Sequence, residues 1–375
     1  MLIAAAPLIA GQRASAQTAP IKILGPSQQT STGAITATQT PPLDAVLAQA
    51  KVLADNGSAS KAERTVRDYL AAQPNSANAH FLLGYIFFRE VQEQVETPAK
   101  SQSATPANDA VSATVTGNAS RHSPDAAMDL TGEFARYRDA KAKASLAEFT
   151  EGAQHQTPSA FDLKIVGFDY VLLGDYPDAD KWFTKMLEWN PNDSEGWYHL
   201  GRTKYNENRF EEAVHAFQQL LKLDPKNVKA EDNLGLAFAG LGHVEDAAAA
   251  YQSAIAWQKQ AEIKNPGPYI DMGSLLLDQN RSPEAITYLR QAIEISPRDF
   301  KAHELLGKAY SRLDQLPEAQ HELEQAMALA PQNSNLPCML GPLYHKQGLM
   351  DKAKVQLDRC AAMSGTHSLP ETPRR

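Results

Sequence analysis

The chain has 375 residues, of which 43% are hydrophobic and 21% are charged, a composition typical of soluble proteins with a packed interior. Its net charge of −8 disfavours nucleic acid as a partner, because proteins that bind nucleic acids usually carry a basic face. No stretch of the sequence is long and apolar enough to predict a membrane span.

The first 42 residues predict two segments without a globular fold. Residues 1–16 combine a short apolar stretch with Ala14-Ser15-Ala16, a pattern typical of signal-peptide cleavage sites. No basic residue precedes the apolar stretch, so we interpret these residues as a truncated secretory signal, with an alanine-rich disordered tail as the alternative. The expected location is therefore periplasmic or extracellular, or else cytoplasmic. Residues 17–42 hold few large apolar groups and predict a disordered linker.

From Leu43 to about Ala362 the apolar residues follow a helical period, with a repeat of 34 residues superimposed on it. Small residues mark this repeat at Ala50, Gly84, Gly167, Gly201, Gly235, Gly273, Gly307 and Gly341, with one step of 38 after Gly235. Large apolar residues, here called the seam residues, follow at Val66, Phe149, Phe183, Phe217, Tyr251, Leu289, Leu323 and Leu357. The small residues allow two antiparallel helices to approach closely, and the seam residues fill the space between them. One such hairpin cannot bury its own apolar face, so the hairpins must stack.

Within this pattern, Trp197, Leu200, Gly201, Ala213, Phe217 and Pro225 resemble the tetratricopeptide repeat signature. The resemblance implies an all-α fold, a right-handed superhelical solenoid of about eight helix-turn-helix hairpins. It places the repeats at 43–76, 77–159, 160–193, 194–227, 228–265, 266–299, 300–333 and 334–367. Lys204 departs from the pattern, because an aromatic residue usually stands there.

The second repeat is interrupted, because its two helices are separated by 49 residues more than usual. Residues 97–123 are rich in Ser, Thr, Ala and Pro and predict a disordered insertion. Helical patterns on both sides predict an elongated hairpin that projects from the solenoid. Residues 368–375 predict a disordered tail.

The sequence contains no recognisable catalytic, cofactor or metal motif. His303-Glu304 and His321-Glu322 begin like the zinc motif HExxH, but the second histidine is missing in both. His199 and His215 are interpreted as surface or edge residues. Cys338 and Cys360 fall on the two helices of the last repeat. They are interpreted as small buried hydrophobes, with a disulfide as the alternative in an oxidising compartment.

The resemblance also implies a binding groove lined by the first helix of each repeat. An aromatic set with polar neighbours maps to this groove in the N-terminal half: Phe81, Tyr85, Phe88, Phe161, Lys164, Phe168, Tyr198, Arg202, Tyr205 and Asn206. A basic set maps to it in the C-terminal half: Lys301, Lys308, Arg312, His345 and Lys346. The alternatives are aromatic packing between hairpins and ordinary solvated charges. The family's carboxylate clamp is not predicted, because Phe168 stands where it needs an asparagine.

These observations predict a non-enzymatic scaffold or adaptor that binds a protein or peptide segment, without a cofactor, in its groove. Cell-envelope assembly is a role suggested by fold analogy alone. A second hypothesis is a structural spacer that makes its contacts through the projecting hairpin and the disordered arms. A third and remote hypothesis is an enzyme whose site carries no recognisable motif.

Overall fold

The computed structural model describes residues 44–99 and 132–363, and the regular structure in these two ranges is α-helical. Its helices pair into eight antiparallel hairpins: α1 (Ala45–Asp55) with α2 (Ala59–Ala72), α3 (Ala77–Ala99) with α6 (Gly132–His155), α7 (Ala160–Leu172) with α8 (Tyr176–Trp189), α9 (Ser194–Asn206) with α10 (Phe210–Leu223), α11 (Val228–Gly240) with α12 (Val244–Trp257), α13 (Gly267–Asp278) with α14 (Ser282–Ile295), α15 (Phe300–Arg312) with α16 (Leu316–Leu329), and α17 (Asn335–Lys346) with α18 (Met350–Met363).

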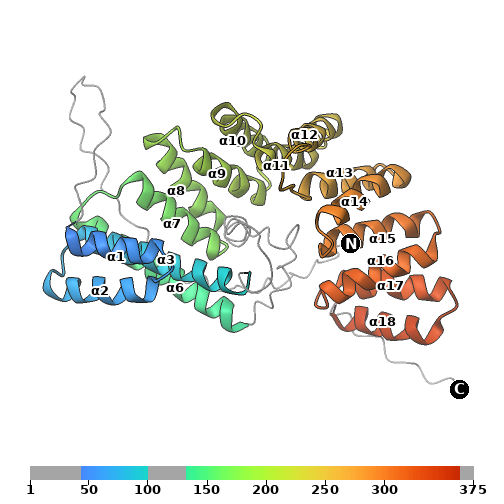
Figure 1. Ribbon diagram of the computed structural model, residues 1–375, viewed down its shortest axis with the longest axis horizontal. Coiled ribbons are helices and arrows are strands. Elements are labelled where there is room, and N and C mark those ends of the chain that lie inside the picture. The colour runs from blue at the N-terminus through green and yellow to red at the C-terminus, as the bar shows by residue number, and fades with distance from the viewer. Residues whose placement is uncertain (1–43, 100–131, 364–375) are drawn as a thin grey trace, which may run out of the picture.

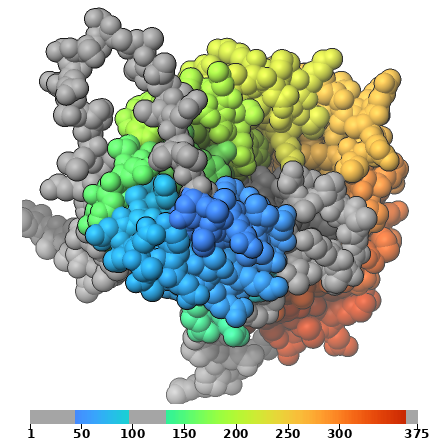
Figure 2. Space-filling model, turned by 60° about the vertical axis from the view of Figure 1, so that its left-hand side comes forward, coloured from blue at the N-terminus to red at the C-terminus, as the bar shows by residue number. Residues whose placement is uncertain are grey.

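The hairpins stack side by side into a curved solenoid, which confirms the predicted fold class (Figure 1). The first helices of successive hairpins contact one another, as α9 contacts α11 and α13 contacts α15. In α7 to α12 the first helices lie on the inside of the curve and the second helices on its outside (Figure 1); the first helices are here called the inner row and the second helices the outer row. Seen from the side of α1–α3, the later hairpins curve away behind this end (Figure 2). The inner row is where the predicted groove lies.

Each hairpin closes through contact between a small residue and its seam residue. A Cβ atom added to Gly201 would lie 2.7 Å from the ring of Phe217, closer than real Cβ atoms come to other heavy atoms. The same contact occurs across six further hairpins, in the pairs Gly84–Phe149, Gly167–Phe183, Gly235–Tyr251, Gly273–Leu289, Gly307–Leu323 and Gly341–Leu357. The glycines therefore set how closely the two helices of a hairpin approach each other.

The turn inside the hairpins is also repeated. One residue in it adopts a left-handed conformation, with φ between 58° and 75°, at Gly57, Gly174, Asn208, Gly242, Asn280, Asp314 and Gly348. These positions hold only Gly, Asn or Asp, the residue types that reach this conformation at the lowest cost. In the second hairpin the interrupting segment takes the place of this turn.

Three of the junctions between hairpins carry a hydrogen bond from an aromatic nitrogen on the first helix to the preceding proline carbonyl. Nε1 of Trp197 donates to the carbonyl oxygen of Pro191 at 2.8 Å. His80 Nε2 lies 2.8 Å from the oxygen of Pro74, and His303 Nε2 lies 3.1 Å from that of Pro297. Because a carbonyl only accepts, both histidines must carry a proton on Nε2. Their Nδ1 atoms then face Glu148 and Glu322 at 2.7 and 2.6 Å.

The extra residues between the fifth and sixth hairpins form a loop that one buried side chain closes. Gln258 is 3% exposed, and its amide donates to the carbonyl of Asn265 at 2.9 Å and accepts from the nitrogen of Asn265 at 2.6 Å. The loop is therefore held at its base although it carries no helix.

The interrupted hairpin begins its insertion later than predicted. Helix α3 continues through Ala99, so residues 97–99 are helical instead of disordered. The remainder of the predicted insertion up to residue 123, the segments 1–16 and 17–42, and the tail 368–375 lie outside the described residues.

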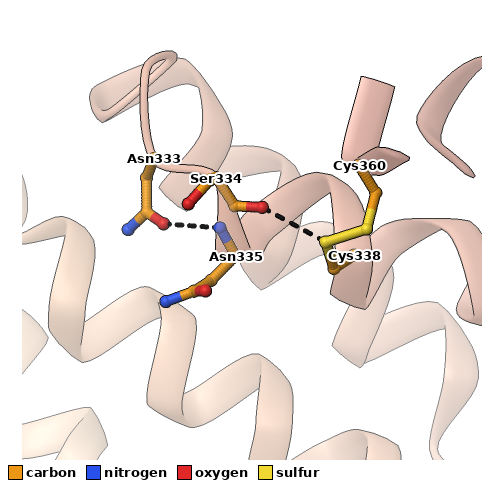
Figure 3. The surroundings of a disulfide bond; sticks show 5 residues. All are labelled: Asn333, Ser334, Asn335, Cys338 and Cys360. Carbon is orange, nitrogen blue, oxygen red and sulfur yellow. Dashed lines mark hydrogen bonds between the residues drawn. A yellow bond between two sulfur atoms is a disulfide. The ribbon is translucent and has the colours of Figure 1, made fainter. Parts of the chain in front are cut away.

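The two cysteines form a disulfide between α17 and α18, with Cα atoms 4.9 Å apart (Figure 3). The interpretation of Cys338 and Cys360 as small buried hydrophobes is therefore wrong, since both are also partly exposed. The sequence placed them on facing helices, but helical period alone did not show that the side chains meet at the edge of the hairpin.

We predict that Gly201→Leu lowers the free energy of unfolding by about 1–3 kcal/mol, because the new side chain must displace the ring of Phe217. Gly132→Leu is the matched control, since a Cβ at Gly132 meets no atom within 4 Å. Urea unfolding followed by circular dichroism measures both. Equal losses at the two sites would contradict the role given to the glycine contact.

Reduction of the disulfide should loosen the last hairpin while the others stay intact. The cross-link closes a segment with a sequence separation of 22, and removing such a loop constraint costs about 3 kcal/mol in the chain-entropy model. Hydrogen exchange measured by mass spectrometry, with and without reductant, should show faster exchange in α17 and α18 than in α15 and α16. Unchanged exchange in α18 would contradict this expectation, and Cys338→Ser/Cys360→Ser should be insensitive to the reductant.

Candidate binding groove

The inner row begins with an aromatic surface that three hairpins build together. The ring of Tyr85 lies 5.4 Å from that of Phe161, and the ammonium of Lys51 lies 5.1 Å from the Tyr85 ring centre. The hydroxyl of Tyr85 donates to Asp55 at 2.6 Å, and burial together with this bond raises the pKa of Tyr85. Phe161 is 43% exposed, so its ring is the part of this surface that a partner can reach. Tyr85 and Phe161 thus lie together across two neighbouring hairpins.

Three other aromatic residues of the predicted set belong to the core instead. Phe81, Phe88 and Phe168 are 6%, 3% and 6% exposed. Phe81 stacks on Phe149, while Phe88 stacks on Phe168 with ring centres 5.4 Å apart. The alternative, packing between neighbouring hairpins, describes Phe88 and Phe168, which lie on adjacent first helices, whereas Phe81 packs within its own hairpin.

The polar members of the N-terminal set line the middle of the inner row. Lys164 bridges two carboxylates of the next hairpin, Asp193 at 3.0 Å and Glu195 at 2.8 Å. Burial alone would lower the pKa of Lys164, but these carboxylates raise it, so the side chain stays charged. Arg202 is 4% exposed, whereas three neighbours are half-buried: Tyr198, Tyr205 and Asn206.

His199 lies on the floor of this middle region, which corrects its interpretation as a surface or edge residue. It is 5% exposed, and the ring of Phe168 stands edge-on to it at 4.5 Å. Burial, followed by the positive charges of Arg202, Lys164 and Lys229, lowers the pKa of His199 to about 3. Nδ1 of this neutral ring has no hydrogen-bond partner among the described residues. An unpaired buried nitrogen is costly, about 1–3 kcal/mol.

The next two first helices also carry a polar residue at the position equivalent to His199. Asn233 and Asp271 are 7% and 8% exposed. Apolar residues fill the same position in four flanking repeats: Leu82, Ile165, Leu305 and Met339. Three consecutive repeats therefore have a buried polar residue at the same position of the first helix. These residues (His199, Asn233 and Asp271) are here called the polar floor. The sequence signal was a polar residue at an apolar repeat position, and it was not used in the prediction.

Much of the predicted basic set in the C-terminal half is engaged within the chain. Lys301 pairs with Glu304 at 3.0 Å, and Lys346 pairs with Asp314 at 3.4 Å. The guanidinium of Arg312 donates to the carbonyl of Leu277. Lys308 is half-buried and His345 is exposed. The structure thus spreads these residues over two hairpins and balances part of their charge, as the alternative of ordinary solvated charges implies.

The described residues give no metal centre and no membrane-crossing segment. No group of three or more His, Cys, Asp or Glu side chains in residues 44–99 and 132–363 is arranged to hold a metal ion. Among the helices in the same two ranges, none has the length and apolar character needed to cross a bilayer.

Comparison with known proteins places these features in one family. Models of the tetratricopeptide repeat match residues 47–93, 198–261 and 300–333, and a TPR repeat model matches 273–314. A peroxisomal targeting signal receptor of Kluyveromyces lactis is 33% identical over 100 residues, which cover 27% of this chain and 18% of the receptor. The protein O-mannosyl-transferase TMTC3 of Mus musculus is 31% identical over 130 residues, which cover 32% of this chain and 14% of that protein. The similarity thus spans less than a fifth of either relative.

Solved structures share the fold at low sequence identity. PilW, a type IV pilus biogenesis factor, superimposes with a TM-score of 0.50 at 16% identity, covering 56% of this chain and 94% of PilW. A chain of the APC/C hetero-tetramer Cut9-Hcn1 superimposes with a TM-score of 0.51 at 15% identity, covering 84% of this chain and 66% of that one.

The two kinds of buried histidine should give opposite pH dependences of stability. His199 has a folded pKa far below its ordinary value of 6.5, so the unfolded state takes up a proton that the folded state refuses. The contribution of His199 to the free energy of unfolding is then complete above pH 6.5. Below pH 6.5 it falls by up to about 1.4 kcal/mol per pH unit. His199→Gln should remove this fall, as urea midpoints measured from pH 8 to pH 4 would show.

His303 is the matched control for this measurement. Burial alone would lower the pKa of His303, but its bonds to Glu322 and to the carbonyl of Pro297 raise it above 6.5. Its contribution to stability is complete below pH 6.5 and is lost as the pH rises through the folded pKa. His303→Gln should therefore lower stability by a constant amount below pH 6.5 and change the slope of the profile only above pH 6.5, where the wild type loses this contribution. A fall below pH 6.5 that persists in His199→Gln would contradict the assignment of His199.

Proposed function

Because the chain belongs to the tetratricopeptide-repeat family, we propose that it is a non-enzymatic scaffold that holds an extended segment of a partner protein in its inner row. The observation that carries this proposal is the polar floor next to an exposed aromatic ring. A peptide backbone presents donors and acceptors along its whole length, and the half-buried Tyr198, Tyr205 and Asn206 around the buried His199 present polar side chains to it. Phe161 supplies an apolar contact one hairpin away. Aromatic anchors beside polar groups are typical of interface centres.

The partner chemistry that fits best is a segment with an anionic group. The charges that lower the pKa of His199 come from Arg202, Lys164 and Lys229, so a negative group bound beside this ring gains attraction to all three. Asp193 and Glu195 already balance Lys164, which limits the gain to a modest preference. One relative carries the name of a targeting signal receptor, which supports a role in recognising a segment of another protein.

We further propose that the protein acts outside the cytoplasm, in the assembly of the cell envelope. The disulfide between Cys338 and Cys360 supports this location, because such bonds persist in oxidising compartments and are rare in the cytosol. The cleavage-like pattern Ala14-Ser15-Ala16 agrees with it. The cytoplasmic alternative requires that the two cysteines remain reduced.

A structural spacer remains the second candidate, and the interrupted hairpin favours it. Helices α3 and α6 contain 23 and 24 residues, whereas the other described helices contain 11 to 14. The pair therefore extends well beyond its neighbours and can reach a partner without the inner row.

Photo-crosslinking in the native host tests the proposal. A photoreactive phenylalanine analogue replaces Phe161 on the inner row, or Trp189 at the end of an outer helix, two residues of nearly equal exposure (43% and 41%). Adducts formed from position 161 and absent from position 189 are the expected result. The analogue at Glu133, at the start of α6, reports on the spacer alternative, and adducts from position 133 alone would replace the groove proposal with it.

A further inference from the structure

The last described hairpin leaves open a surface that the seven hairpins before it bury. Their seam residues are 0–2% exposed, because the first helix of the following hairpin covers them, whereas Leu357 in α18 is 43% exposed. Leu357 still contacts its own hairpin, since a Cβ on Gly341 would lie 2.7 Å from its side chain. Met350, two helical turns earlier on the same face, is 55% exposed. The hairpin is thus closed, and only its outer side presents apolar atoms.

The opposite end of the solenoid is built differently. The residue before each small residue is large, apolar and 1–7% exposed in seven hairpins: Leu83, Val166, Leu200, Leu234, Met272, Leu306 and Leu340. In the first hairpin this residue is Gln49, which is exposed and polar. The same helix also exposes Val46 at 45% and Val52 at 56%, so this end is of mixed character. A head-to-tail contact would set the polar Gln49 where every later hairpin has a buried apolar residue, which disfavours that contact.

We propose that the open face of α18 is the interface of a homodimer in which two C-terminal ends meet about a two-fold axis. Met350, Lys354, Leu357 and Ala361 share one face of α18 at helical spacing. In an antiparallel pairing of two such helices, Met350 lies opposite Ala361 of the second copy and Lys354 lies opposite Leu357 of the second copy. The contact is therefore isologous, which closes the assembly at two subunits.

Charge complementarity selects a second copy as the occupant. In this pairing the stem of Lys354 covers the leucine of the other copy, and its ammonium reaches the neighbouring Asp358 of that copy. Neither Lys354 nor Asp358 has an ion-pair partner among the described residues.

Sedimentation velocity on the full-length, oxidised protein tests this proposal. A single hairpin face is small, so we expect a wild-type dimer with a dissociation constant in roughly the micromolar range. Leu357→Glu and Met350→Glu should each give monomers at the same concentrations, because the pairing would bury a carboxylate on each side. Val355→Glu is the control, since Val355 is 61% exposed but lies on another face of α18, and it should remain dimeric.

Three outcomes would overturn the proposal. A wild type that stays monomeric at all concentrations shows that the face does not pair with itself. A Met350→Glu variant that stays dimeric, with an unchanged circular dichroism spectrum, places the contact elsewhere. Species larger than a dimer that dissociate on Val52→Glu, at the exposed N-terminal end, show head-to-tail association.

Discussion

The close contact between a glycine and its seam residue is the constraint on which the rest of the molecule depends. It fixes the separation of two helices at the point where the second helix crosses the first, as Phe217 does over Gly201. Because the same contact recurs from hairpin to hairpin, the hairpins are nearly alike, and nearly alike units stack with a constant rotation. A constant rotation produces the curve, and the curve sets the first helices side by side on the inner row (Figure 1).

The periodic residues made the fold predictable, and the same periodicity explains where prediction of the site stopped. Spacing alone shows that Phe161 and Phe168 lie on the same helix near the groove. It does not show that Phe88 of the preceding hairpin lies against Phe168 and covers it, because that contact depends on the distance between first helices. His199 was misplaced for the converse reason. A polar residue was assumed to face solvent, although its position in the repeat is a buried one.

The middle of the solenoid combines buried polar side chains with a small apolar cluster. The C-terminal hairpins share one large apolar cluster, whereas the cluster between them and the N-terminal hairpins consists of Ala213, Phe217, Leu234 and Ala237 with their neighbours. Beside it, Lys204 takes the place of the usual aromatic residue and pairs with Asp180 at 2.7 Å. A ligand bound at the polar floor would stabilise the region that has the smallest apolar cluster.

The two end hairpins of residues 44–363 face the opposite problem, because each has a described neighbouring hairpin on one side only. The stability of a repeat protein is roughly the sum of the stability of each hairpin and the energy of each interface between neighbours. The last described hairpin has one such interface, with the hairpin before it. The disulfide between Cys338 and Cys360 supplies a constraint at this place, where the next first helix would otherwise hold α18 against α17. The cysteine on α18 stands at a repeat position that is buried in the five preceding hairpins, at Met186, Leu220, Ala254, Ala292 and Ala326. The cross-link therefore keeps the terminal hairpin closed while its outer face remains open for another surface.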